Sequence, residues 1–163
     1  MITDTKPEFS ELVELVKNDV GSGLVARRHF SKGEIICPLT WAGRKSEPTR
    51  WTIQCGLDEH AEILPIELRY VNHSCNPNVF FDVEKNELRA LHDIAPGEEL
   101  RYFYPSTEWQ MDEPFDCKCG ENGCCGRIAG ASQMSVDILH RYELSRVIEQ
   151  KLKALLAGAV AAD

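Results

Sequence analysis

The side chains best suited to chemistry are concentrated in two short runs. The first run, "YVNHSCNPNVFF" over residues 70–81, sets Asn72, His73 and Cys75 between apolar residues. A cysteine next to a histidine is the pattern of a thiol nucleophile activated by an imidazole. Such pairs usually come from distant segments, however, and no oxyanion hole is indicated nearby. Metal binding and a simple chain turn are the two other interpretations.

The second run, "CKCGENGCC", holds Cys117, Cys119 and Cys124 within residues 117–124, with Cys125 adjoining. A structural zinc site needs four ligands in a closed tetrahedron, so these three thiols leave one ligand to come from elsewhere. Within the loop, we prefer Cys124 to Cys125, because successive side chains of extended backbone point in opposite directions. The sequence therefore predicts a metal loop that is completed by a distant residue.

Cys75 is the preferred fourth ligand, because it lies in a polar turn from which a thiolate can point outward. Cys37 and Cys55 lie in apolar stretches and are expected to be ordinary buried thiols. If Cys75 binds zinc, it is not available as a nucleophile. The interpretation of the first run as a thiol enzyme then fails.

Composition limits the classes of protein and of partner. The chain has 163 residues, enough for one domain with a real core, and 43% of them are hydrophobic. No apolar run approaches the roughly 20 residues that cross a bilayer, and the N-terminus lacks the pattern of a secretion signal. We therefore expect no membrane partner and an intracellular location, cytoplasmic or nuclear.

The net charge is −8, with 26 acidic and 18 basic residues, and no basic block is longer than Arg27-Arg28. Direct binding of nucleic-acid phosphates depends on clustered basic side chains and is not expected. A basic protein or peptide is the better complement to this surface, although negative charge also serves solubility alone.

The first two thirds of the chain read as short strands between turns. Strands are expected on both sides of the "FSKGE" turn, at "WTIQCG", in a hairpin through residues 79–91 and in the aromatic run that ends at Tyr104. Residues 11–18 fit a strand and a helix equally well. From Ser135 onward, apolar residues at helical spacing predict one amphipathic packing helix with Ser135 as its N-cap and a stop near Gly158.

Four segments, taken in order, resemble the motifs of SET-domain protein lysine methyltransferases with a C-terminal post-SET zinc loop. They are "GSGLVA" (21–26), "RYVNHSCNPN" (69–78), "GEELRYFY" (97–104) and "CKCGENGC" (117–124). The resemblance implies a β-rich fold, mainly β with a C-terminal α-helix, made of small twisted sheets with a pseudoknot. It divides the chain into a SET domain (11–106), a linker with the post-SET zinc loop (107–128) and a helical extension (129–163).

The resemblance also implies a site. S-adenosylmethionine would be held by Ser22, Gly23, Asn72, His73 and Tyr104. Tyr104 matches the catalytic tyrosine of the family, which would orient the amine of a lysine for attack on the methyl group.

Tyr102 matches the position at which tyrosine restricts multiple methylation in the family, so monomethylation or at most dimethylation is expected. Trp41 or Trp51 would line the lysine channel, because the chain has no tyrosine before Tyr70. Phe103 stands where the family usually has an acidic or small residue. The zinc ligands implied by the resemblance are Cys75, Cys117, Cys119 and Cys124.

The function that the resemblance implies is methylation of a lysine in a basic protein, with a histone tail as one candidate. Two alternatives stay open: an inactive module that binds cofactor or peptide, and a SET-fold enzyme diverted to a non-protein substrate. Glu108, Asp112, Glu113 and Asp116 would either line an acidic groove for a basic peptide or be solvated. The sequence does not indicate an oligomeric state.

Overall fold

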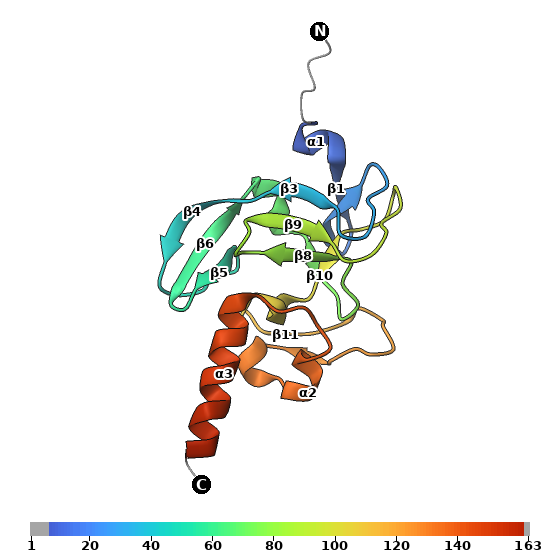
Figure 1. Cartoon of the computed structure of the whole chain (residues 1–163). Coiled ribbons are helices and arrows are strands. Elements are labelled where there is room, and N and C mark those ends of the chain that lie inside the picture. The colour runs from blue at the N-terminus through green and yellow to red at the C-terminus, as the bar shows by residue number, and fades with distance from the viewer. Residues whose placement is uncertain (1–6, 162–163) are drawn as a thin grey trace.

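The computed structural model describes residues 7–161, and side chains up to residue 159. Short strands in five small sheets are spread from residue 13 to residue 128, and the longest helix lies at the C-terminal end (Figure 1). The predicted β-rich class is thus confirmed. No helix within the described range is long and apolar enough to cross a membrane.

Three strand groups form the bulk of the molecule. They are the antiparallel pair β1 (Val13–Asn18) and β2 (Gly21–Ala26), the sheet β3 (Ile35–Pro38), β9 (Glu87–Ala90) and β8 (Val79–Asp82), and the sheet β4 (Thr40–Lys45), β6 (Glu59–Leu64) and β5 (Thr52–Gly56). The expected strands are present. The ambiguous segment at residues 11–18 divides, because the short helix α1 (Phe9–Leu12) ends where β1 begins.

The predicted hairpin is β8 joined to β9, paired antiparallel from Val79 opposite Ala90 to Asp82 opposite Glu87. Its turn contains Asn86 with φ of 57°, a left-handed conformation that asparagine tolerates better than most residues. The turn thus fixes the register that puts Phe81 into the core, fully buried.

Two remote segments run side by side as parallel strands, β7 (Asn72–His73) and β10 (Arg101–Tyr102). The pairing continues beyond them, since Ser74 donates its N–H to the Tyr102 carbonyl at 3.0 Å. The segment that contains β10 also contacts β2, where the Leu100 N–H donates to the Leu24 carbonyl at 2.8 Å. This threading between an early and a later segment forms the pseudoknot of the fold, which places residues 72–75 beside residues 101–104.

Two hydrophobic clusters meet at residues 102–104. The large cluster fills the sheets and includes Tyr102 with Tyr104 packed against it, whereas the smaller one contains Phe103, Leu139 and Ile148. Because neighbouring side chains on extended backbone point to opposite faces, the two tyrosines share one face and Phe103 takes the other. Phe103 therefore anchors the C-terminal part of the chain to the sheets.

The prediction of one C-terminal helix is wrong in extent. The structure has α2 (Val136–Leu139) and α3 (Arg146–Ala161), separated by a bend. Ser135 does cap α2, because its side chain accepts from the Ile138 N–H, but Gly158 does not end α3. The bend arises where Tyr142 stacks on Phe103, with ring centroids 3.6 Å apart, and this contact outweighs continuous helical spacing.

The remaining short elements lie around the later part of the chain. They are the 3₁₀ helices η1 (Ile66–Tyr70), η2 (Tyr104–Ser106) and η3 (Ala131–Gln133), and the paired strands β11 (Phe115–Asp116) and β12 (Arg127–Ile128). The cysteine-rich loop runs between β11 and β12, so a two-residue ladder closes its base.

Candidate active site and cysteine cluster

Tyr104 is held at both ends by the β7 segment. Its backbone N–H donates to Nδ1 of His73 at 3.1 Å, and its hydroxyl donates to the Val71 carbonyl at 3.2 Å. Burial raises the pKa of Tyr104 to about 12, so the phenol stays protonated at neutral pH. Its hydroxyl proton is committed to Val71, and the oxygen lone pairs are left to accept from another group.

Tyr102 lies beside Tyr104 with ring centroids 4.6 Å apart, and Phe81 meets it edge-on at 4.6 Å. Only 7% of Tyr102 is exposed, and burial raises the pKa of its hydroxyl well above the usual value. The two tyrosines thus form one aromatic wall, and Phe81 of the sheet core fixes its position.

His73 contacts protein through both ring nitrogens, since Nε2 lies 3.4 Å from the Cys75 sulfur while Nδ1 serves Tyr104. Burial lowers the pKa of His73 to about 4 and keeps the ring neutral. A cofactor contact by His73, as the resemblance implies, would therefore use its main chain and not its ring.

Asn72 lies beside Ser22 and Gly23. The Asn72 amide donates to the Ser22 carbonyl at 2.8 Å and to Oε1 of Glu99 at 2.9 Å. A Cβ on Gly23 would lie 2.7 Å from that Glu99 oxygen, closer than real contacts allow. Within residues 7–161 no hydrogen bond reaches Oδ1 of Asn72, which is therefore available to a ligand donor such as an ammonium group.

The four predicted ligand cysteines meet in space. Their sulfur atoms all lie within 4.8 Å of one another, in the set Cys75, Cys117, Cys119 and Cys124. A tetrahedral ion with metal–sulfur bonds of about 2.3 Å separates its ligands by about 3.8 Å. The Cys75 and Cys117 sulfurs are 3.8 Å apart, so the donor set and its spacing both fit zinc.

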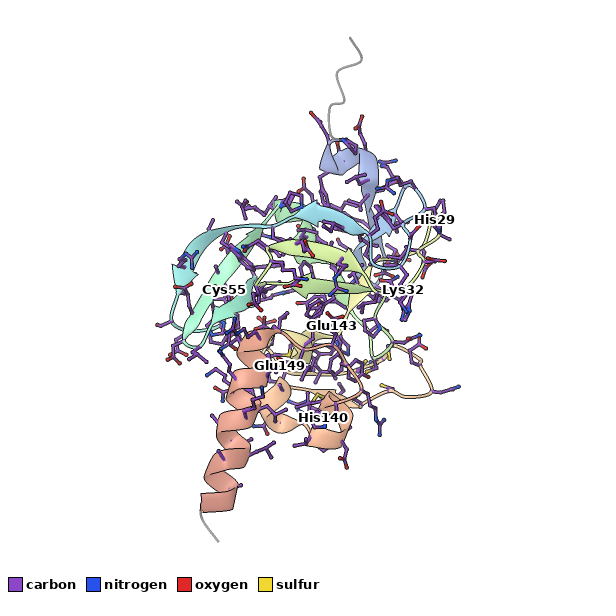
Figure 2. The ribbon with its side chains drawn as sticks, in the orientation of Figure 1. His29, Lys32, Cys55, His140, Glu143 and Glu149 are labelled. Carbon is purple, nitrogen blue, oxygen red and sulfur yellow. The ribbon has the colours of Figure 1, made fainter. Side chains whose placement is uncertain are left out.

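The remaining cysteines lie outside the cluster. Cys125 turns its sulfur toward the Tyr142 hydroxyl at 3.6 Å, and gives only its backbone N–H to the Cys75 sulfur at 3.3 Å. Cys55 lies on the sheet of β4, β6 and β5 (Figure 2). Cys37 is buried in the sheet core, where burial raises its pKa to about 12.

Burial also raises the pKa of Cys75, whose thiol is therefore protonated in the absence of a cation. A metal cation favours the thiolate and displaces that proton. Metal binding at this cluster should thus be pH-dependent and should release protons.

Sequence reasoning missed two residues that build the site. The side chain of Asn78 donates to the Glu99 carbonyl at 2.9 Å and accepts from the Arg101 N–H at 2.8 Å. Glu99 links Asn72 to Arg101 through its two carboxylate oxygens. The available signals were an amide directly after Pro77 for Asn78, and the position of Glu99 within the segment "GEELRYFY".

Glu108 is not part of an open acidic groove, because only 6% of it is exposed. Its Oε1 accepts from the Gln54 N–H at 3.1 Å and from the Thr107 hydroxyl at 3.4 Å. Burial raises the pKa of Glu108 to about 8. Two of the other acidic residues are next to cations: Glu113 lies 3.9 Å from Arg50, and Asp116 lies 3.3 Å from Arg127.

Of the two tryptophans expected at the lysine channel, Trp51 is the one that lies beside Tyr70. Its ring meets Tyr70 edge-on at 6.5 Å, and the Arg50 and Arg69 guanidinium carbons lie 4.8 Å from its centroid. Trp41 instead donates to the Asn86 side chain at 2.6 Å, in the β8–β9 turn.

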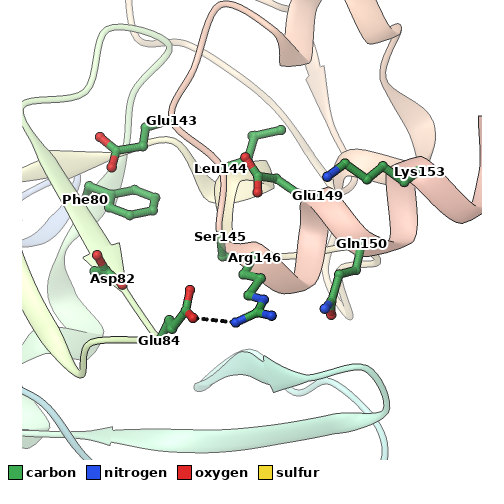
Figure 3. Close-up of a pocket in the computed structure, with 10 residues that line it drawn as sticks. All are labelled: Phe80, Asp82, Glu84, Glu143, Leu144, Ser145, Arg146, Glu149, Gln150 and Lys153. Carbon is green, nitrogen blue, oxygen red and sulfur yellow. Dashed lines mark hydrogen bonds and ion pairs between the residues drawn. The ribbon is translucent and has the colours of Figure 1, made fainter.

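The described part of the chain has two surface pockets, of which the second adjoins the predicted site. The first lies between β8 and the start of α3, where Arg146 binds Glu84 at 2.7 Å; none of the predicted catalytic, cofactor or metal residues lines it (Figure 3). The second is lined by Asn78, Glu99, Arg101 and Glu121, among others. It therefore joins the Asn72 network to the cysteine loop.

Comparison with known proteins assigns the chain to a family. The SET domain family model matches residues 21–105. "Methyltransferase flvH" of Aspergillus flavus is 35% identical over 157 residues, which are 94% of this chain and 85% of that protein. The chain therefore belongs to the SET domain family and is a SET-domain methyltransferase.

Other relatives match a smaller part. The H3 lysine-36 specific histone-lysine N-methyltransferase of Aspergillus oryzae is 44% identical over 71 residues, 40% of this chain and 7% of that protein. The H3 lysine-4 specific enzyme of Aspergillus fumigatus is 40% identical over 65 residues, 36% of this chain and 5% of that protein. The chain thus spans less than a tenth of these two proteins.

Solved structures show the same fold. KRYPTONITE in complex with mCHG DNA and SAH superposes with a TM-score of 0.55 at 21% identity, over 71% of this chain and 28% of that one. The methyltransferase domain of human SETMAR gives a TM-score of 0.52 at 22% identity, over 70% of this chain and 56% of that one.

Proposed function

We propose that the protein transfers a methyl group from S-adenosylmethionine to the side-chain nitrogen of a lysine in a basic protein segment, with a histone tail as one candidate. The observation that carries this proposal is the threading of β10 beside β7, which joins Asn72, His73 and Tyr104 in one place. The proposal also assigns residues 11–106 to the SET domain, 107–128 to the linker and zinc loop, and 129–163 to a helical extension.

In this site Asn72 would hold the cofactor through its free Oδ1, and Ser22, Gly23 and the main chain of His73 would complete the binding surface. When bound, S-adenosylmethionine supplies an electrophilic methyl group on a sulfonium. The reaction needs in-line alignment and a neutral amine more than a strong acid or base.

Tyr104 is the proposed catalytic residue. Because its hydroxyl proton is given to Val71, the oxygen can accept a hydrogen bond from the attacking amine and orient the nitrogen lone pair. A lysine has a pKa near 10.4 in water, and a desolvated site beside a cationic sulfonium lowers it. The buried wall of Tyr102 and Tyr104 provides such a site.

Tyr102 limits the product in this proposal. Its ring packs against both Phe81 and Tyr104, so a nitrogen that already carries methyl groups has little room to rotate. We therefore propose a mono- or dimethylated product. Replacing Tyr102 by phenylalanine would remove one hydroxyl and leave the ring contacts.

Zinc is the proposed resident metal, held by Cys75, Cys117, Cys119 and Cys124. Four thiolates would form a closed site, so the metal would stabilise the loop and would not activate water.

If the substrate is a histone tail, the protein acts in the nucleus in this proposal.

A second candidate function is methylation of a small-molecule amine. The observation that favours it is that the relative matching nearly the whole chain is described only as a methyltransferase, whereas the match to the histone enzymes stops at 40% of the chain or less.

The test uses the full chain loaded with zinc and labelled S-adenosylmethionine, incubated with histones, a basic peptide library and a mixture of small amines. We expect label in protein or peptide, and a loss of about 100-fold or more with Tyr104→Phe. Label only in the small-molecule fraction establishes the second candidate. Cofactor binding with no transfer to any acceptor would identify an inactive binding module and refute both.

A further inference from the structure

The imidazole of His73 lies between the cysteine cluster and Tyr104. Nδ1 is 3.1 Å from the Tyr104 backbone nitrogen, and Nε2 is 3.4 Å from the Cys75 sulfur. Three aromatic rings fix the ring plane at centroid distances of 5.1 Å for Tyr104 and 5.6 Å for Phe103 and Phe115. The ring is thus a rigid spacer with one contact at each end.

These contacts determine the tautomer. A backbone N–H can only donate, so Nδ1 must present its lone pair to Tyr104. The single proton of the neutral ring is therefore on Nε2, and it points at the Cys75 sulfur. An N–H is the partner that a metal-bound thiolate accepts.

A second donor completes the environment of that sulfur, because the Cys125 N–H also points at it at 3.3 Å. Such outer donors orient a metal ligand and tune its affinity. Cys75 differs from the three loop cysteines in this respect, since it lies on the β7 side of the molecule and is the one ligand outside the β11–β12 loop.

We infer that His73 is a positioning residue that connects occupancy of the cysteine cluster to the placement of Tyr104. This inference rests on the proposed function, because it concerns the metal and the tyrosine of that same site. An ion at the cluster holds the Cys75 thiolate, which holds the ring through Nε2–H, and the ring holds the Tyr104 backbone through Nδ1. The Tyr104 hydroxyl, tied to Val71, then has one orientation.

Coupling of this kind is reciprocal. If an occupied cluster favours the bound position of Tyr104, then whatever stabilises that position must tighten metal binding by the same factor. A ring that merely filled space would leave the two sites independent.

Two variants separate the two contacts. In His73→Asn the amide oxygen can take the place of Nδ1 and accept from Tyr104, but nothing reaches Cys75. In His73→Gln the amide nitrogen can take the place of Nε2 and donate to Cys75, but the Tyr104 N–H loses its acceptor. Tyr142→Phe is the matched control, because it removes a hydroxyl that donates to the Cys75 carbonyl at 2.8 Å and touches neither end of the ring.

The first measurement is zinc affinity by chelator competition, which needs no turnover. We expect His73→Gln to stay within about threefold of the parent and His73→Asn to bind zinc about 10-fold or more weakly. Equal affinities of the two variants would overturn the inference.

The second measurement is hydrogen exchange at the Tyr104 amide, the group that donates to Nδ1. Adding zinc to the metal-free parent should slow this exchange by about 10-fold, and Tyr142→Phe should behave likewise, whereas His73→Gln should show no effect of zinc. An exchange rate that zinc does not alter in the parent would refute the coupling.

The third measurement is the ¹⁵N spectrum of the His73 ring in the zinc-loaded chain. The proton is expected on Nε2, and a proton on Nδ1 would overturn the assignment.

A fourth measurement is kinetic and requires an identified methyl acceptor. His73→Gln should lower kcat about 10-fold with little change in KM, and His73→Asn should lower kcat less. If no acceptor is methylated, the proposed function fails, while the zinc, exchange and ¹⁵N results still decide the role of His73.

Discussion

The sheet core and the cysteine loop are held together in opposite ways. In the core, apolar side chains such as Leu24, Phe81 and Leu88 are fully buried. Between Phe115 and Arg127, by contrast, no residue of the loop is buried, and a two-residue ladder closes its base. Burial of apolar area stabilises the first region, whereas the second has no buried side chain to stabilise it.

The two halves of the site are therefore held in place differently. Tyr102 and Tyr104 are held rigidly by the core, because they pack on it directly. Cys117, Cys119 and Cys124 gain little order from their own loop, and we propose that a bound metal orders them.

The largest effect is expected from removing a thiol of the loop. Cys119→Ser should abolish stoichiometric zinc and raise hydrogen exchange across residues 115–128, while the sheets keep their protection, because structural zinc contributes about 10 kcal/mol or more to the segment it orders. Metal analysis and exchange mass spectrometry measure both results. Cys55→Ser, a half-buried thiol outside the cluster, should retain the metal. Equal unfolding of sheets and loop in Cys119→Ser would show that the two regions are not held separately.

The second effect concerns the core. Phe81→Ala should lower the free energy of unfolding by about 3–5 kcal/mol, since it leaves a cavity at a fully buried position against Tyr102. Phe115→Ala in the half-buried loop region should lower it by about 1 kcal/mol. Urea titrations of the zinc-loaded variants make the comparison. A loss for Phe115→Ala as large as for Phe81→Ala would remove the contrast.

The third effect is a pH dependence from Glu108, the buried carboxyl that accepts from the Gln54 N–H of β5. Burial raises the pKa of Glu108 in the folded chain to about 8, far above that of a solvated carboxyl in the unfolded chain. The unfolded chain therefore loses the proton first, and stability falls as pH rises from about 4.5 to 8. Glu108→Gln should remove this slope and be more stable than the parent at pH 8.5, by on the order of 3 kcal/mol. Thermal unfolding across pH, with the exposed Glu113→Gln as control, measures it, and an unchanged slope would contradict the assignment.

The smallest effect is at the proposed cofactor surface. Gly23→Ala brings a Cβ to within 2.7 Å of Glu99 Oε1. The flexible carboxylate can yield, so we expect a loss of only about 1 kcal/mol in stability but a fall of about 10-fold in cofactor affinity, measured by calorimetry. Gly123→Ala in the loop meets nothing within 4 Å and is the matched control. Unchanged cofactor affinity in Gly23→Ala would exclude this surface as the binding site.

The strands and turns of the core were predictable because their signals are local. Alternating apolar residues and turn residues define β2, β3 and the β8–β9 hairpin within a few positions of sequence. The order of four motifs then indicated the family. The division of the C-terminal stretch into α2 and α3 was not predictable, since it depends on Tyr142 stacking on Phe103, far from it in sequence.

The same contact explains an unusual residue. Phe103 stands between the two tyrosines where an acidic or small residue is usual in the family, and the structure shows it buried in the smaller cluster with Leu139 and Ile148. Its role is to attach the C-terminal helices. The local sequence does not predict this packing role of Phe103, because either face of a short strand can be the buried one.

The sequence alone specifies which residue types are available: a polar run with Asn72, His73 and Cys75, an aromatic run with Tyr102 and Tyr104, and a loop with four thiols. Only the tertiary structure decided which of them meet and through which atoms. In the folded chain, both ring nitrogens of His73 contact protein atoms, the Cys125 sulfur points away from the cluster, and Glu108 is buried. The physical reason is that hydrogen-bond direction and burial belong to pairs of residues remote in the chain, and a linear pattern carries no distance between them.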